Sequence, residues 1–282
     1  MEIIKTVEDL VARREELEGV YQTIGFVPTM GALHKGHISL VEKSVKESDY
    51  TIVSVFVNPK QFNEQSDFDN YPVNYSSDLK LLEYSGCDMV FMPKSDDIYS
   101  DYDGFEIDFG GLDKVYEGEF RPGHFQGVVD VVYRLFDLVK PQKSYFGQKD
   151  FQQLAIIKRL VSEANLKIEI VSCPIVREDS GLAMSSRNER LSNENRLVAS
   201  EIYREMQVVA TEMKIGDSTS LFAERFNSRM EKIDVMKPEY CIFCHPDSLQ
   251  KIKKVEKNTV LVMCVAVLCT NVRLIDNIIL VF

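Results

Sequence analysis

The stretch Gly25-Phe-Val-Pro-Thr-Met-Gly-Ala-Leu-His-Lys-Gly-His37 joins two segments with different apolar patterns. The apolar residues that lead up to Val27 are typical of a buried strand, and those at four positions from 38 to 45 recur at helical spacing. The stretch therefore lies at a strand-to-helix turn. In an α/β sheet, such turns form the carboxyl edge at which ligands bind.

The composition of this turn suits an anionic ligand. Gly31 and Gly36 let the backbone approach a ligand without a Cβ in the way, and amides that open a helix favour phosphate. His34 and His37 can face the same side of the first helical turn, where imidazoles donate hydrogen bonds or carry charge near neutral pH. Two histidines at this spacing can also be ordinary surface groups, but the strand–turn–helix setting favours a nucleotide site.

The overall composition limits the classes of partner. The 282 residues suffice for two domains, and the 45% hydrophobic and 27% charged content is ordinary for a globular protein. A net charge of −11 argues against nucleic acid or an anionic membrane as the main partner, so an anionic ligand needs a local group of cations. The first residues lack a signal-peptide pattern and no apolar run reaches transmembrane length, which predicts a cytoplasmic protein.

The cysteines raise one competing interpretation. Six cysteines would be reduced in the cytoplasm, although Cys241-Ile-Phe-Cys244-His245 matches the pattern of c-type haem attachment. That chemistry requires export, for which the sequence holds no signal. The same spacing fits a plain strand that is stopped by Pro246, and we favour the strand.

The order of the predicted elements indicates the fold. Strands are expected over residues 21–28, 50–57, 88–92, 105–109, 144–147 and 168–171, alternating with helices over 6–17, 37–47, 76–85, 127–139 and 151–164, and with a polar loop over 64–74. This alternation predicts a parallel sheet with right-handed crossovers. Helices over 192–213 and 218–233 and strands over 239–244, 260–268 and 273–280 then follow. We expect a Rossmann-like α/β domain over 1–187 and a smaller C-terminal α+β domain over 188–282.

Further polar groups follow other predicted strands. Asn58 and Gln61 could bind a hydroxyl or carboxylate, or could equally form a capped turn. Within Gly147–Asp150, Lys149 is a candidate phosphate ligand, although surface lysines are the commoner case. Residues 181–188 combine a glycine, two hydroxyls and a guanidinium, a group that can wrap a polyphosphate or cap a helix.

Six stretches distributed over nearly the whole chain resemble the pantothenate synthetase family, within the superfamily of adenylate-forming enzymes with class I aminoacyl-tRNA-synthetase-like nucleotide folds. They are Val27–His37, Phe56–Phe62, Arg121–Phe125, Phe146–Gln153, Ala183–Asn188 and Arg273–Asn277. His34-x-Gly-His37 resembles the HIGH-type signature of this superfamily, and Met184-Ser-Ser-Arg187 resembles its KMSKS-type loop. Another nucleotidyltransferase of the superfamily remains the alternative, because it would share both loops.

The resemblance implies ATP-dependent ligation of pantoate with β-alanine through a pantoyl-adenylate, in a homodimer, with Mg²⁺ accompanying ATP and no metal ligand assigned to the protein. It implies ATP contacts from Met30, Gly31, Ala32, Leu33, His34, Lys35, Gly36, His37, Gly147, Gln148, Lys149, Asp150, Val176, Met184, Ser185, Ser186 and Arg187. It implies catalytic roles for His37, His34, Lys149 and Arg187, and substrate contacts from Gln61, Gln153 and Asn58.

The chain departs from the family pattern in two places. Val73 stands where family members commonly have arginine. The following segment, residues 74–81, has fewer acidic and amide groups than the Mg²⁺-contacting segment of some relatives, and Asp78 is therefore not assigned to a metal. Cys241–His245 has no role in the resemblance.

Overall fold

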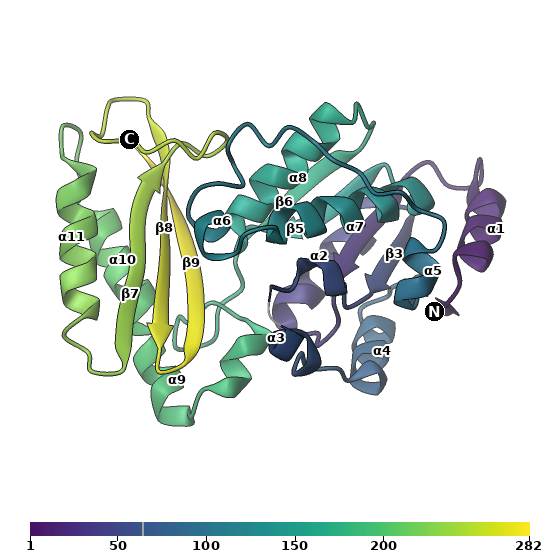
Figure 1. The fold of residues 1–282 in the computed structure, drawn as a ribbon, viewed down its shortest axis with the longest axis horizontal. Helices are drawn as coiled ribbons and strands as arrows, with labels where there is room; N and C mark the ends of the chain where they lie inside the picture. Colours follow the sequence, from purple (N-terminus) through teal and green to yellow (C-terminus); the bar gives the residue numbers. More distant parts are fainter. Residues whose placement is uncertain (64) are drawn as a thin grey trace. The chain divides into compact units, whose positions relative to one another are not determined.

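The chain forms two compact units in a computed structural model that describes residues 1–63 and 65–282 (Figure 1). The first unit comprises residues 1–147 and 156–173, and the second comprises residues 148–155 and 174–282. Among the helices of these described residues, none is both long and apolar enough to cross a bilayer.

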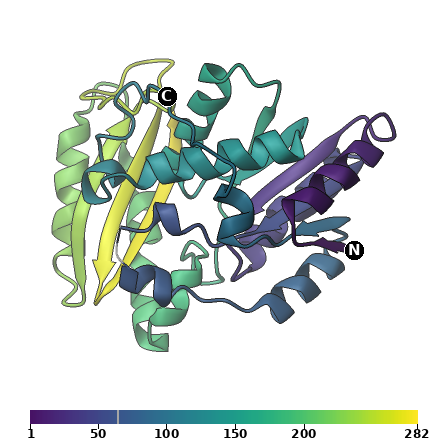
Figure 2. The same cartoon turned by 45° about the vertical axis from the view of Figure 1, so that its right-hand side comes forward.

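The first unit is built on a parallel sheet with helices packed around it (Figures 1 and 2). The sheet has six strands in the order β1-β4-β3-β2-β5-β6. Its strands are β1 (Glu2–Ile4), β2 (Ile24–Thr29), β3 (Tyr50–Val55), β4 (Met89–Phe91), β5 (Lys143–Gly147) and β6 (Glu169–Cys173). The chain order reverses beside β2, which lies between β3 and β5. In open α/β sheets, ligands bind outside the carboxyl ends of the strands at such a reversal.

Helices connect the strands of this sheet. They are α1 (Val7–Leu17), α2 (Lys35–Glu47), the 3₁₀ helix η1 (Pro59–Gln61), α3 (Gln65–Asp69), α4 (Tyr75–Tyr84), α5 (Ser95–Tyr99), α6 (Glu117–Phe120), α7 (His124–Val139) and α8 (Phe151–Glu163). Residues 151–155 of α8 belong to the second unit and the remainder to the first.

Both faces of the sheet are buried, which explains why its central strands are almost wholly apolar. Successive strand residues point to opposite faces. Val27 of β2 joins a core cluster with Val41 of α2 and Leu82 of α4, whereas the neighbouring Phe26 packs edge-on against Phe136 of α7. All six residues of β3 are buried, so the predicted strand with two buried faces is confirmed.

The second unit contains a three-stranded antiparallel sheet of β7 (Met236–Cys244), β8 (Val260–Cys269) and β9 (Val272–Val281). Its helices are α9 (Asn193–Ala199), α10 (Glu201–Glu212) and α11 (Thr219–Met230), with the 3₁₀ helix η2 at Ser186–Arg190. Alternate residues of β8, such as Met263 and Val265, share a core with Met206 of α10 and Phe226 of α11. The predicted fold class, a parallel α/β sheet followed by a C-terminal antiparallel sheet with helices, is confirmed.

The strand predicted over residues 105–109 is wrong. These residues form no strand, because the backbone groups of Phe105 bond to side chains of α7. The Phe105 N–H donates to Asp130 Oδ1 at 3.0 Å, and its carbonyl accepts from Gln126 Nε2 at 2.8 Å. A backbone whose hydrogen bonds are satisfied in this way needs no neighbouring strand.

Other boundaries also differ from the prediction. The helix expected over 192–213 is two helices that meet at Ser200, whose hydroxyl donates to the Leu197 carbonyl at 2.6 Å and competes with the helical backbone. Helix α3 lies within the expected polar loop of residues 64–74, whose first residue, Glu64, falls outside the described residues. Strand β1 was not predicted, because three residues are too few to show a period.

The close approach of α7 to η1 yields a stability prediction. A Cβ at Gly127 of α7 would lie 2.3 Å from the carbonyl oxygen of Lys60. Gly127→Ala should therefore destabilise the protein by roughly 1 kcal/mol or more, although alanine favours a helix by about that amount. Urea unfolding measures the change. Ser162→Ala on the exposed side of α8 is the control and should not destabilise, and a Gly127→Ala variant as stable as wild type would contradict this packing.

Candidate active site

The loop between β2 and α2, residues 30–34 and here called the histidine loop, has an unusual backbone. Gly31 and Ala32 both adopt positive φ angles, of 80° and 50°. A Cβ at Gly31 would also lie 3.0 Å from Asp78 Oδ2, so this position favours glycine for two reasons. The Gly31 N–H donates to Thr29 Oγ1 at 3.2 Å, and this hydroxyl donates to the Ser54 carbonyl of β3 at 2.7 Å. The loop is thus tied to the end of the sheet.

A buried carboxylate holds the next part of the loop. Asp78 of α4 is 2% exposed, and its two oxygens accept from the amides of Ala32 at 3.0 Å and Leu33 at 2.8 Å. Burial raises the pKa of the Asp78 carboxyl, and the two amides partly oppose this rise. The sequence left the role of Asp78 unassigned, because neither its burial nor its partners are visible in a polar segment.

The two histidines form a stacked pair at the start of α2. Their ring centroids are 4.1 Å apart, with 28° between the planes. His34 Nδ1 accepts from the Gly36 amide at 3.1 Å, and His37 Nδ1 accepts from the His34 amide at 3.4 Å. Each neutral ring therefore carries its proton on Nε2. The expectation that the two rings face the same side is confirmed, and the pair can present two N–H donors.

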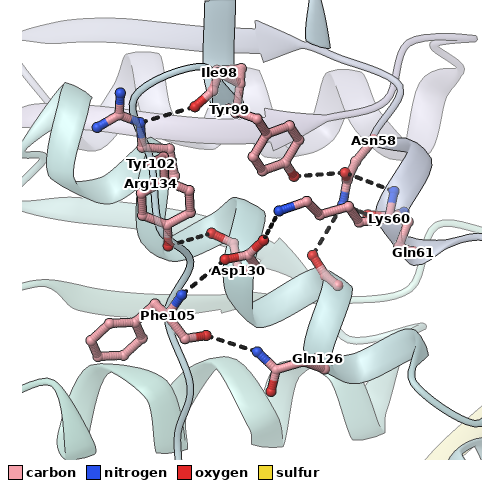
Figure 3. Close-up of polar contacts among 11 residues, drawn as sticks. Asn58, Lys60, Gln61, Ile98, Tyr99, Tyr102, Phe105, Gln126, Asp130 and Arg134 are labelled. Atoms are coloured by element: carbon pink, nitrogen blue, oxygen red, sulfur yellow. Dashed lines mark hydrogen bonds and ion pairs between the residues drawn. The ribbon is translucent and has the colours of Figure 1, made fainter. Parts of the chain in front are cut away.

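The polar residues after β3 lie in η1 and just before it (Figure 3). Asn58 is fully buried. Its Oδ1 accepts from the Lys60 amide at 3.2 Å and from the Tyr99 hydroxyl at 2.7 Å. Its Nδ2 donates to Gln61 Oε1 at 3.2 Å and to the Gly127 carbonyl at 3.0 Å. Asn58 could bind a substrate or cap a turn, and in the structure its side chain caps η1. It also holds the side chain of Gln61.

Gln61 links three of the stretches singled out in the sequence. It is 8% exposed, and its Nε2 contacts Met30 Sδ in the histidine loop. Its carbonyl accepts from Nδ1 of His124 at 2.7 Å. His124 begins α7 and is only 5% exposed. No individual role was predicted for His124, although it lies in the family-like stretch Arg121–Phe125.

In the second unit, hydrogen bonds from β9 hold residues 148–149, which follow β5. Asn277 is 3% exposed, and its Nδ2 donates to the carbonyls of Gln148 at 2.9 Å and Lys149 at 3.0 Å. Gln148 Nε2 returns a bond to Asn277 Oδ1 at 3.1 Å. Asn277 therefore fixes the backbone from which the Lys149 side chain extends.

Residues 176–184 form a small hairpin in the same unit. The Met184 amide donates to the Val176 carbonyl at 2.9 Å, so two residues predicted to contact ATP lie side by side. Arg177 makes a two-pronged ion pair with Asp276 of β9, with N–O distances of 2.5 and 2.9 Å. Its guanidinium also lies 3.4 Å from the ring centroid of Tyr203. No function was predicted for Arg177 or Asp276, which lie about a hundred residues apart.

The loop after this hairpin has a capping structure. Ser185 Oγ accepts from the Arg187 amide at 3.3 Å at the start of η2. Asn188 Nδ2 donates to Glu178 Oε1 at 2.7 Å, and Arg196 makes two bonds of 2.8 Å to Glu178. Burial alone would raise the pKa of Glu178, but the Arg196 and Asn188 hydrogen bonds and the Arg196 charge lower it.

The predicted site residues therefore fall into two groups. Those of the first unit lie at or just beyond the carboxyl ends of β2, β3 and β5, and they are residues 30–37, Asn58, Gln61 and Gly147. Those of the second unit are residues 148–150, Gln153, Val176 and residues 184–187. Gly147 leaves room for a ligand, since a Cβ there would meet no atom of the described residues within 4 Å.

The cysteine motif lies in a strand, as predicted. Cys241 and Cys244 are buried in β7, and burial raises the pKa of the Cys241 thiol. Among the residues that the structure describes, no three His, Cys, Asp or Glu side chains gather closely enough to hold a metal ion.

Comparison with known proteins extends over the whole chain. A family model described as pantoate-beta-alanine ligase matches residues 2–279. Pantothenate synthetase from Cytophaga hutchinsonii is 43% identical over 282 residues, covering 99% of each chain. The protein of that name from Bacteroides thetaiotaomicron is 44% identical over 281 residues, covering 99% of this chain and 98% of its own.

Solved structures agree with the sequence matches. Pantothenate synthetase from Thermus thermophilus superposes with a TM-score of 0.88 at 37% identity, covering 99% of both chains. Pantoate-beta-alanine ligase from Francisella tularensis, described as complexed with beta-gamma ATP and beta-alanine, gives a TM-score of 0.81 at 35% identity, covering 99% of this chain and 97% of its own. The family expected from the six stretches is confirmed: the chain belongs to the pantoate–β-alanine ligase (pantothenate synthetase) family.

Proposed function

We propose that the protein ligates pantoate with β-alanine in two steps driven by ATP. In the first step, the pantoate carboxylate attacks the α-phosphate of ATP, and pyrophosphate leaves to give pantoyl-adenylate. In the second step, the β-alanine amine attacks the activated carbonyl, loses a proton and displaces AMP. The observation that carries the proposal is the family match over residues 2–279, which includes every proposed site residue.

The histidine pair would act on the phosphates. With Nδ1 of each ring accepting a backbone amide, the Nε2–H groups are the donors that can stabilise negative charge as pyrophosphate leaves. His37 would give a proton to the leaving group, and His34 would assist it. Lys149 and Arg187 would supply positive charge, which a chain of net charge −11 must gather locally.

The other proposed site residues divide between ATP and the two acid substrates. ATP would lie against residues 30–37, 147–150 and 184–187 and against Val176. Gln61 and Gln153 would bind pantoate, because an amide can accept from a hydroxyl and donate to a carboxylate, and β-alanine would also lie near Gln61. Asn58, whose amide atoms bond to Gln61, Tyr99 and the backbone, would contribute to substrate binding by holding Gln61.

Mg²⁺ would enter with ATP. Both oxygens of Asp78 already accept backbone amides, and we assign no residue of the chain to the ion. Phosphate oxygens and water are its usual ligands. When bound, Mg²⁺ would neutralise part of the phosphate charge.

We also propose a cytoplasmic homodimer. Residues 1–187 would form the ATP- and pantoate-binding domain and residues 188–282 the smaller domain. Size-exclusion chromatography with light scattering measures the oligomeric state directly.

An AMP-formation assay in which each substrate is omitted in turn tests the proposed function. We expect pyrophosphate release with ATP and pantoate alone, and AMP release only when β-alanine is added. A panel of other carboxylic acids serves as the control for the related nucleotidyltransferases. Equal pyrophosphate release with another acid, or none with pantoate, would overturn the proposal.

Two substitutions should each weaken the binding of one ligand and not of the other. Gln153→Ala should weaken pantoate binding and leave ATP binding largely intact, because it removes an amide that pairs with pantoate oxygens. Lys149→Ala should do the reverse, because it removes a cation facing the phosphates. Calorimetric titration of each variant with ATP and with pantoate measures the effects. Loss of the same ligand in both variants would show that this division is wrong.

Asp78→Asn should reduce turnover without unfolding the protein. Asparagine offers one acceptor oxygen where the carboxylate offers two, so one of the Ala32 and Leu33 amides loses its partner and the histidine loop shifts. We expect a fall in kcat of about 10- to 100-fold, smaller than the ~10²–10⁴-fold expected for removing a general acid by His37→Ala.

Asp49→Asn is the matched control for Asp78→Asn. Asp49 Oδ2 also accepts two backbone amides, from Gln22 at 3.1 Å and Thr23 at 2.9 Å, but at the opposite end of β2. This variant should keep its turnover. Normal kcat in Asp78→Asn, or equal losses in the two variants, would count against a specific role for Asp78.

A further inference from the structure

Asp130 of α7 bonds to two other segments of the first unit (Figure 3). Its Oδ2 accepts from Lys60 Nζ in η1 at 2.7 Å, and its Oδ1 accepts from the Phe105 amide at 3.0 Å. The backbone carbonyl of the same residue accepts from the Tyr102 hydroxyl at 3.2 Å. Asp130 on α7 therefore fixes η1 and residues 102–105 at one point.

The ammonium of Lys60 is held from two sides. Besides the ion pair with Asp130, it lies 3.8 Å from the ring centroid of Tyr99, a distance typical of a cation–π contact. The Asp130 side chain is 8% exposed, whereas that of Lys60 is 45% exposed. Loss of the Lys60 ammonium would leave a buried carboxylate without the cation that balances its charge, and such a charge is costly.

A continuous path leads from this pair to Gln61. The Lys60 ammonium lies against the Tyr99 ring, and the hydroxyl of Tyr99 donates a hydrogen bond to Asn58 Oδ1 at 2.7 Å. Asn58 in turn donates to Gln61 Oε1 at 3.2 Å. Lys60 is also the immediate neighbour of Gln61 in η1. The side chain of Gln61 is thus supported both through the backbone of η1 and through Tyr99 and Asn58.

We propose that Lys60 and Asp130 form a positioning pair that fixes Gln61 for the acid substrate. This inference rests on the proposed role of Gln61 in binding pantoate. Neither member of the pair needs to touch the substrate. Their effect is to hold η1, Tyr99 and residues 102–105 in the arrangement in which the Gln61 amide is aligned.

A double-substitution cycle tests the pair. Lys60→Met keeps the unbranched stem without the charge, and Asp130→Asn keeps an acceptor for the Phe105 amide. Each single variant should raise the KM for pantoate by roughly tenfold, because a displaced binding group loses alignment, while the KM for ATP stays within about twofold of wild type. The double variant leaves no unpaired charge, so its pantoate KM should lie well below the product of the two single effects. Lys60→Arg should restore most of the binding.

Hydrogen exchange provides a readout that is independent of activity. Amides of residues 99–105 should exchange faster in Lys60→Met than in wild type, because their junction with α7 and η1 is loosened. The matched control is Lys143→Met, which removes the Lys143–Glu169 pair between β5 and β6, with N and O 3.8 Å apart. This control should change neither the pantoate KM nor the exchange of residues 99–105.

Gln61→Ala distinguishes the two proposals. If Gln61→Ala raises the pantoate KM but both single charge variants bind pantoate normally, the positioning role is overturned and the proposed site stands. If Gln61→Ala itself binds pantoate normally, the proposed substrate role of Gln61 fails and the inference fails with it. If the pantoate KM of the double variant rises by the product of the two single-variant effects, Lys60 and Asp130 act independently, and the proposed positioning pair is also overturned.

Discussion

The parallel pairing of β2 with β3 on one side and β5 on the other is the constraint on which the first unit depends. Because all three strands run the same way, the segments that follow them start from the same edge of the sheet. The histidine loop and η1 are two of those segments, and Gly147 is the last residue of β5 at the same edge. Functional side chains from distant parts of the sequence can therefore come together at this edge, even though each of the segments is short.

Beyond the strand ends, buried polar side chains hold the backbone in place. Asp78 fixes the histidine loop and Asn58 fixes η1. In the second unit, Asn277 fixes residues 148–149, and Asp276 fixes the hairpin that carries Val176 and Met184. Each of these side chains is at most 5% exposed. Shielded from water, such bonds keep a loop in one conformation, as preorganised binding requires.

The sequence predicted most of the helices and strands because their apolar periods are regular, and it predicted the family from six short stretches. It did not predict the partners that hold those stretches. Asp78 lies 45 residues from Leu33, and Asp130 lies 70 residues from Lys60, so no local pattern connects them. The false strand at residues 105–109 has the same cause, since the decisive bonds of Phe105 come from α7. Side chains that bond to a distant backbone become visible only once the chain is folded.

The fastening of residues 148–149 by Asn277 bears on the order in which the protein matures during synthesis. The first part of the parallel sheet can form early, as its strands leave the ribosome. The backbone at Gln148 and the guanidinium of Arg177, however, wait for Asn277 and Asp276, which are translated about a hundred residues after Arg177. A nascent chain thus carries the histidine pair long before the partners that hold residues 148–149 and Arg177 have been synthesised. The residues of the second unit that we propose to contact ATP would therefore reach their final arrangement only after residues 276 and 277 have been synthesised.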